Sequence, residues 1–139
     1  RKFHYQWQVI YMVEILHNKS NKINIGNHGI ADITGVNKSK LMDSYYLMKN
    51  LRIALEKSYF TILDQKVIKF PGKDSGITGF FVLSESHAAF HTYPEYEYMG
   101  LDIFSCGNSS PMDVIEYFSK LIDAKTCLVE SVERGMNIR

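Results

Sequence analysis

The chain has few cysteines: only Cys106 and Cys127 occur among its 139 residues. Two cysteines are too few for a disulfide framework, and they lack the paired spacing of a zinc site. In a reducing compartment both would be free thiols. We therefore expect no disulfide scaffold and no metal site.

The chain also has almost no excess of charge of either sign. Its 16 Lys and Arg residues nearly balance its 15 Asp and Glu residues, which leaves a net charge of +1. Nucleic-acid binding needs a basic face, and here the basic residues are spread along the chain. The chain also lacks an apolar run of about 18 residues and a signal-peptide pattern. These absences predict a cytoplasmic protein whose partners are neither nucleic acids nor membranes.

What is present is ordinary for one globular domain, with 45% hydrophobic residues, enough for a buried core. A polar stretch at residues 17–26 is typical of a loop. It separates a leader of uncertain structure, residues 1–26, from a domain at residues 27–139. Within the leader, Phe3–Leu16 fits a strand or an amphipathic helix equally well.

Apolar periodicity divides residues 27–139 into strands and helices. Asn37 is a plausible N-cap, and Ser110 followed by Pro111 is typical of a helix start. The helix after Asn37 is expected to bury Leu41, Tyr45, Met48, Leu51 and Leu55. The expected helices are Lys38–Lys57 and 111 to about 123, and the expected strands are His28–Thr34, Phe60–Phe70, Ile77–Leu83, His87–Tyr93, Tyr98–Cys106 and Thr126–Val132. This order predicts an α+β two-layer sandwich, a largely antiparallel sheet with two main helices on one face.

The segment Leu83–Glu95 concentrates polar and reactive side chains. Two serines, two acids and two histidines lie in its thirteen positions. By itself, Ser84-Glu85-Ser86 is most typical of a turn between strands, and neither a Walker loop nor a nucleophile elbow is present. If residues 84 and 85 form a two-residue hairpin loop, Thr78 lies directly across from His91.

Three ordered blocks in this region carry a family resemblance. They are Glu85-Ser86-His87, then His91-Thr92-Tyr93-Pro94-Glu95, then Asp102-Ile103-Phe104-Ser105-Cys106-Gly107. These blocks resemble the prokaryotic S-adenosylmethionine decarboxylase family, which shows Glu-Ser-His, His-Thr-Trp-Pro-Glu and an Asp before Thr-Cys-Gly. Supporting matches are His28, Asp32 and Gly35 near the start and Arg134-Gly135 near the end. The resemblance covers residues 27–135.

The resemblance implies a proenzyme that makes a covalent pyruvoyl cofactor from its own Ser86. Ser86 would attack the carbonyl of Glu85, and the chain would be cleaved between residues 85 and 86. His91 would shuttle the proton, with Thr78 in the place of the family's serine. The pyruvoyl ketone would hold the substrate as a Schiff base and act as the electron sink. Cys106 would return a proton to the substrate carbon.

Simpler interpretations exist for single positions. Without the resemblance, Thr78 is an ordinary β-branched strand residue. Cys106 is then as readily a structural cysteine at the end of a strand. Cys127 has no family counterpart, and core packing explains it.

The resemblance also implies S-adenosylmethionine as the substrate, with a product that feeds spermidine biosynthesis. Phe70 and Tyr93 would embrace the adenine and the sulfonium by stacking and cation–π attraction, and Glu95 would bind the ribose hydroxyls. Tyr93 departs from the family's usual tryptophan. The alternatives are a pyruvoyl-dependent decarboxylase of arginine or ornithine, or a non-catalytic homologue. By resemblance, a homodimer of processed protomers is expected.

Overall fold

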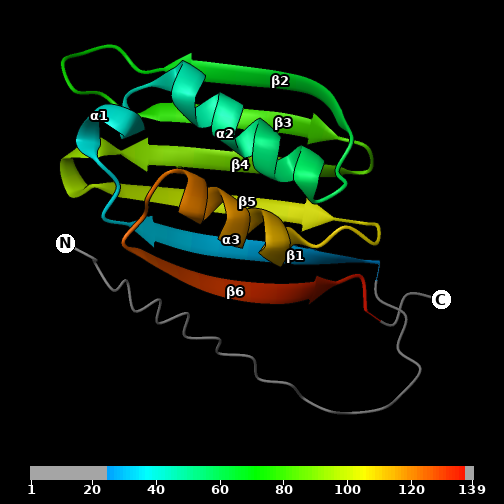
Figure 1. The fold of residues 1–139 in the computed structure, drawn as a ribbon. Coiled ribbons are helices and arrows are strands. Elements are labelled where there is room, and N and C mark those ends of the chain that lie inside the picture. Colours follow the sequence, from blue (N-terminus) through cyan, green and yellow to red (C-terminus); the bar gives the residue numbers. More distant parts are fainter. Residues whose placement is uncertain (1–24, 137–139) are drawn as a thin grey trace.

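A six-stranded antiparallel sheet forms one layer of the molecule, with the strand order β2-β3-β4-β5-β1-β6. The structure, a computed structural model, describes residues 25–136. The strands are β1 (Gly26–Thr34), β2 (Ile62–Lys69), β3 (Ile77–Leu83), β4 (Ser86–Tyr93), β5 (Tyr98–Ser105) and β6 (Thr126–Arg134), and the helices are α1 (Lys38–Leu41), α2 (Ser44–Lys57), the 3-10 turn η1 (Pro94–Tyr96) and α3 (Pro111–Leu121). Figure 1 shows α2 and α3 side by side on one face of the sheet. The predicted two-layer α+β architecture is confirmed.

The predicted leader, residues 1–26, falls almost entirely outside the described residues, and so do both alternatives for Phe3–Leu16. β1 begins at Gly26, one residue before the predicted start of the domain. Among the helices between residues 25 and 136, none has the length and apolar character needed to cross a membrane.

Alternation of buried and partly exposed side chains along each central strand sets the two faces of the sheet. On β5, Leu101 and Ile103 are buried, whereas Asp102 and Phe104 are partly exposed, as their positions in the sequence predict. The largest fully buried side chains are Phe81, Phe90, Phe118, Ile33, Leu41, Leu47, Leu51, Leu55, Ile77, Met99, Ile103 and Ile115. They form the core between the sheet and the two helices. We call the sheet face opposite α2 and α3 the open face.

The single helix predicted over Lys38–Lys57 is wrong, because the chain breaks it into α1 and α2. The Asp43 carboxylate accepts a hydrogen bond from the backbone N–H of Tyr46 at 3.0 Å and so starts a second helix. The break turns Tyr45 outward, where 76% of it is exposed, although it was expected on the buried face. Leu47 is buried in its stead.

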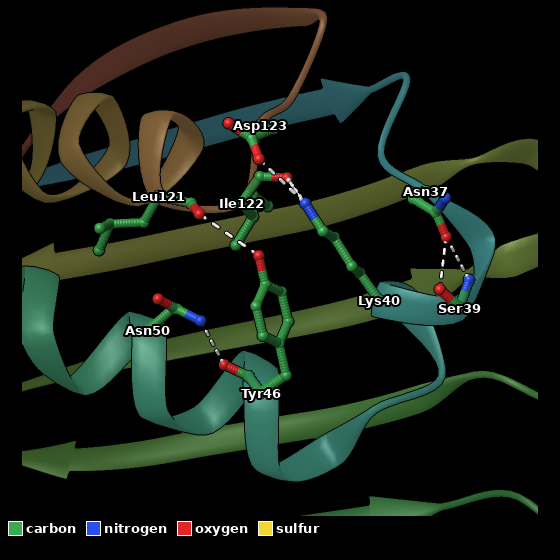
Figure 2. A network of polar contacts seen from close by, with 8 residues as sticks. All are labelled: Asn37, Ser39, Lys40, Tyr46, Asn50, Leu121, Ile122 and Asp123. Carbon is green, nitrogen blue, oxygen red and sulfur yellow. Dashed lines mark hydrogen bonds and ion pairs between the residues drawn. The ribbon is translucent and has the colours of Figure 1, made fainter.

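A group of polar contacts ties the start of this helical region to the end of α3 (Figure 2). The Lys40 ammonium donates to the Asp123 carboxylate at 3.1 Å. The Tyr46 hydroxyl donates to the backbone carbonyl of Leu121 at 3.3 Å. Because these contacts join segments about eighty residues apart, they help to set the two helices side by side on the sheet.

The predicted strands are present, with shifted ends. β2 begins at Ile62 rather than Phe60, because the Phe60 backbone bonds back to Leu55 and its side chain is buried. β4 begins at Ser86, one residue earlier than predicted. β6 extends two residues past the predicted end, to Arg134, which brings that guanidinium onto the sheet.

Candidate active site

The β3–β4 hairpin turns at Ser84 and Glu85, and Leu83 pairs with Ser86 across it. Glu85 has a φ of +60°, in the left-handed region. For a residue with a side chain this conformation costs about 1–2 kcal/mol. The strain therefore lies in the residue whose carbonyl carbon forms the 85–86 peptide bond.

Ser86 and Cys106 lie together at one end of the sheet, where β4 begins and β5 has just ended. The backbone N–H of Cys106 donates to the Ser86 hydroxyl oxygen at 3.4 Å. Both residues are half-buried. The other cysteine, Cys127, faces the helices, and its burial raises the pKa of its thiol. Of the two cysteines, Cys106 is thus the one whose backbone contacts the predicted cleavage site.

Thr78 and His91 form the second pair. They are opposite each other in the β3–β4 register, as the two-residue loop predicts. The Thr78 hydroxyl lies 2.9 Å from His91 Nδ1 and donates to it when that nitrogen is unprotonated. His91 is exposed on the open face. A hydroxyl that fixes the ring and its tautomer suits an imidazole that has to move protons.

The two pairs do not meet within one chain. His91 lies five positions after Ser86 on β4, which corresponds to about 17 Å along an extended strand. The odd spacing also sends their side chains to opposite faces of the sheet. The structure therefore places Ser86 next to Cys106 and Thr78 next to His91, and it keeps these two pairs apart.

Phe70, Tyr93 and Glu95 lie at the other end of the sheet from Ser86. Phe70 directly follows β2, and its backbone N–H donates to the Gly76 carbonyl at 3.0 Å. Gly76 stands between β2 and β4, where a Cβ would be only 2.2 Å from the Thr92 carbonyl oxygen. Two strand spacings, about 9.5 Å, therefore separate the Phe70 and Tyr93 backbones with no side chain between them. Glu95, on η1, is exposed two residues after Tyr93.

A cluster that sequence reasoning did not assign lies on the open face near Ser86. Asp102 Oδ1 accepts hydrogen bonds from His28 Nε2 at 2.9 Å and from His87 Nε2 at 3.1 Å. Arg134 donates to His28 Nδ1 at 3.2 Å, and the rings of Phe80 and His87 stack at 5.7 Å. The alternation rule places these residues on one face, but only the strand order makes β1, β4 and β5 neighbours.

The ligand atoms of His28, His87 and Asp102 lie within 4.8 Å of one another, a grouping that can hold a metal ion. Arg134 is only a donor, so His28 Nδ1 has to accept. The His28 proton is then on Nε2, the nitrogen that faces Asp102. A protonated nitrogen cannot bind a metal, so these contacts favour a hydrogen-bonded cluster. The expectation of no metal stays a prediction.

A second unassigned contact lies at the opposite end of the open face. The Tyr98 hydroxyl donates to Asp32 Oδ1 at 2.6 Å. The ring of Tyr98 stacks on that of Tyr93, with centroids 5.6 Å apart. No spacing rule within the sequence pairs β1 with β5, so this contact depends on the fold.

Comparison with known proteins gives the family. Residues 27–135 match the family described as S-adenosylmethionine decarboxylase. An arginine decarboxylase proenzyme of Caldivirga maquilingensis is 38% identical over 114 residues, which cover 80% of this chain and 84% of that protein. An S-adenosylmethionine decarboxylase proenzyme of Picrophilus torridus is 31% identical over 119 residues, covering 85% and 90%. The crystal structure of the adenosylmethionine decarboxylase from Aquifex aeolicus superposes with a TM-score of 0.73 at 26% identity, covering 81% of this chain and 92% of that one. The chain therefore belongs to the S-adenosylmethionine decarboxylase family.

Proposed function

We propose that this protein is a cytoplasmic, self-cleaving proenzyme that becomes a pyruvoyl-dependent S-adenosylmethionine decarboxylase of spermidine biosynthesis. The observation that carries the proposal is the place of Ser86. It directly follows the strained Glu85 in a tight turn and contacts the backbone of Cys106.

Self-cleavage begins with attack of the Ser86 hydroxyl oxygen on the Glu85 carbonyl carbon. The peptide bond becomes an ester. The backbone strain at Glu85 favours the breaking of this peptide bond. Elimination then breaks the ester bond to the Ser86 side chain, releasing Glu85 as a carboxylate and leaving dehydroalanine. Hydrolysis of dehydroalanine with loss of ammonia leaves a pyruvoyl group at residue 86.

A half-buried serine in a hairpin turn, contacted by the backbone N–H of Cys106, suits this group. Once formed, the pyruvoyl ketone supplies an electron sink for the carbanion left by decarboxylation. Cys106, adjacent to residue 86, delivers a proton to the substrate carbon after carbon dioxide leaves. His91, held by Thr78, serves the earlier cleavage.

Ser86 and His91 of one chain lie about 17 Å apart, too far for His91 to act on Ser86 of the same chain. This separation supports a homodimer of processed protomers. In such a dimer His91 of one copy serves Ser86 of the other. The open face, on which His91 lies, supports dimerisation because it exposes several apolar side chains, and sheets commonly pack face to face through such side chains. Exposed apolar residues on it include Ile30, Ile68, Phe80, Val82 and Leu128.

Phe70, Tyr93 and Glu95 favour S-adenosylmethionine as the substrate. The gap over Gly76 offers two ring faces to a flat base, and Glu95 offers two acceptors to a ribose diol. Arginine is the second candidate substrate, because a relative 38% identical to this chain is named as an arginine decarboxylase proenzyme. A non-catalytic homologue has no need for Ser86, His91 and Cys106 together, so that alternative is disfavoured.

Intact-protein mass spectrometry tests the cleavage. Cleavage of the 139-residue chain after residue 85 leaves fragments of 85 and 139 − 85 = 54 residues, and the smaller has a blocked N-terminus. Ser86→Ala should remain whole. Cys106→Ala should still be cleaved but should turn over substrate roughly a hundredfold more slowly. A wild-type chain that stays intact after long incubation would refute the proposed function.

Release of labelled carbon dioxide from carboxyl-labelled S-adenosylmethionine, arginine and ornithine identifies the substrate. We expect release from S-adenosylmethionine. Release from arginine alone would replace the substrate and keep the cleavage mechanism.

Co-expression of Ser86→Ala and His91→Ala chains with different tags tests the dimer. Cleavage of the His91→Ala chain only in the presence of the Ser86→Ala chain is expected. If His91→Ala is cleaved equally well by itself, His91 has no part in cleavage. If it stays whole in the mixture, the intermolecular arrangement is wrong.

A further inference from the structure

We propose that Tyr98 is a positioning residue that holds the Tyr93 ring in place for the substrate, and that Asp32 and Gly100 fix the place of Tyr98. This inference rests on the proposed function, which assigns Tyr93 to the substrate.

Tyr98 covers the side of Tyr93 that faces away from the gap over Gly76. Tyr93 and Tyr98 are paired in the β4–β5 register. Their rings lie 5.6 Å apart with an interplanar angle of 29°. Since β3 and β5 flank β4 on opposite sides, Tyr98 supports the side of Tyr93 toward β5, and the other side lies toward Gly76. Tyr93 remains 45% exposed, so it has a face to offer.

Gly100 leaves room for the Tyr98 side chain to lie along the open face. A Cβ at Gly100 would be 3.2 Å from the Tyr98 hydroxyl oxygen, so the hydroxyl lies over this glycine. Gly100 pairs with Asp32 across the β1–β5 ladder. The Tyr98 hydroxyl thus crosses Gly100 to reach Asp32 Oδ1 at 2.6 Å.

The hydrogen bond to Asp32 holds the phenol in its neutral form. That bond is the main reason why the pKa of Tyr98 is raised to about 12. The phenol therefore remains a donor at every pH at which the protein would work. A tyrosine tied at its hydroxyl and stacked through its ring gives Tyr93 a rigid backing, which lowers the entropy lost when a ligand stacks on Tyr93.

NMR of protein with [13Cε]tyrosine tests the coupling without any assay of activity. In Asp32→Asn and Tyr98→Phe chains, the Tyr93 cross-peak should shift, because the Tyr98 ring changes its place against it. Tyr59→Phe is the matched control, since Tyr59 is 90% exposed and lies outside the sheet. A Tyr93 cross-peak that stays in place in both variants would overturn the proposal.

Steady-state kinetics test whether Tyr98 affects substrate binding. They use the substrate that the wild type decarboxylates. Tyr98→Phe loses one hydrogen bond, so KM should rise roughly three- to tenfold. The kcat and the rate of self-cleavage should stay within about twofold, because uniform binding affects KM alone. In a Tyr93→Ala background, Tyr98→Phe should have no further effect on KM. Equal effects in both backgrounds would show that Tyr98 does not act through Tyr93.

The two failures are distinguishable. A wild-type chain that is neither cleaved nor active refutes the proposed function, and the NMR measurement then decides the coupling of Tyr98 to Tyr93. An active wild type with an unmoved Tyr93 cross-peak refutes only the positioning role.

Discussion

The Thr78 hydroxyl lies 2.9 Å from His91 Nδ1, directly across the β3–β4 hairpin. If this contact orients the imidazole for cleavage, the hydroxyl rather than the shape of the side chain matters. Thr78→Val should slow self-cleavage roughly tenfold or more, whereas Thr78→Ser should cleave at nearly the wild-type rate. Cleavage is followed by mass spectrometry over time. Equal rates for the valine and wild-type chains would remove Thr78 from the mechanism.

Asp102 accepts hydrogen bonds from two imidazoles through one carboxylate oxygen. Asp102→Ala leaves both half-buried rings without this acceptor and should lower the free energy of unfolding by about 1–3 kcal/mol. Urea unfolding in a Ser86→Ala background, which keeps the chain whole, measures the change. Glu130→Ala, at an exposed carboxylate on β6, is the control and should change stability by less than about 0.5 kcal/mol. Equal stability for both variants would mean that the cluster does not stabilise the fold.

The two cysteines should differ in reactivity toward a thiol reagent. Burial raises the pKa of Cys127 and shields its sulfur, so its thiolate is scarce in the folded protein. Cys106 is only half-buried. Under native conditions iodoacetamide should label Cys106 first, and Cys127 should react after unfolding in urea. Peptide mapping locates the label, and Cys106→Ala is the control. Rapid native labelling of Cys127 would contradict its burial.

Alkaline pH should lower the free energy of unfolding through the ionisation of Tyr98. Its pKa is about 12 in the folded state, above the value of about 10 for an unfolded tyrosine. A raised pKa of an acid means that the neutral form is favoured by folding, so this contribution is complete below about pH 10 and is lost between about pH 10 and 12. Urea midpoints of wild type and Tyr98→Phe should therefore converge as the pH rises from 9 to 11.5. A constant difference across this range would argue against the Asp32 hydrogen bond.

Gly76 is the position at which a side chain should be least tolerated between β2 and β4. A Cβ there would lie 2.2 Å from the Thr92 carbonyl oxygen, a backbone atom that cannot rotate away. Gly76→Ala should cost about 1–3 kcal/mol of stability, because the added methyl group forces the two backbones apart. Gly107→Ala is the control for stability, because a Cβ there meets nothing within 4 Å. Chemical denaturation of both variants measures the difference, and equal stability would contradict the close approach.

The sequence by itself determined the local features of this protein. The alternation of Leu101 and Ile103 with Asp102 and Phe104 predicts the two faces of β5 because side chains of a strand alternate. The two-residue loop at 84–85 predicts the pairing of Thr78 with His91, since loop length sets the register of a hairpin. The ordered blocks around Ser86 and Cys106 are sufficient to indicate the family.

Some local features were mispredicted because two signals compete there. Apolar spacing from Leu41 to Leu55 favours one helix, and it places Tyr45 on the buried face. The Asp43 side chain instead caps a new helix, α2, which begins at Ser44, by accepting a hydrogen bond from the Tyr46 backbone N–H. This capping hydrogen bond interrupts the helix that the apolar spacing predicts.

Only the tertiary structure decided which distant residues meet. His28 and Asp102, 74 residues apart, share a hydrogen bond because β1 inserts between β5 and β6, and Tyr98 reaches Asp32 for the same reason. The structure also showed that Ser86 and His91 lie on one extended strand, about 17 Å apart, although the resemblance assigns both to the same cleavage reaction. Short-range periodicity is set by the geometry of each strand. The order of strands depends on burying the sheet against α2 and α3 as a whole, and no single segment encodes that packing.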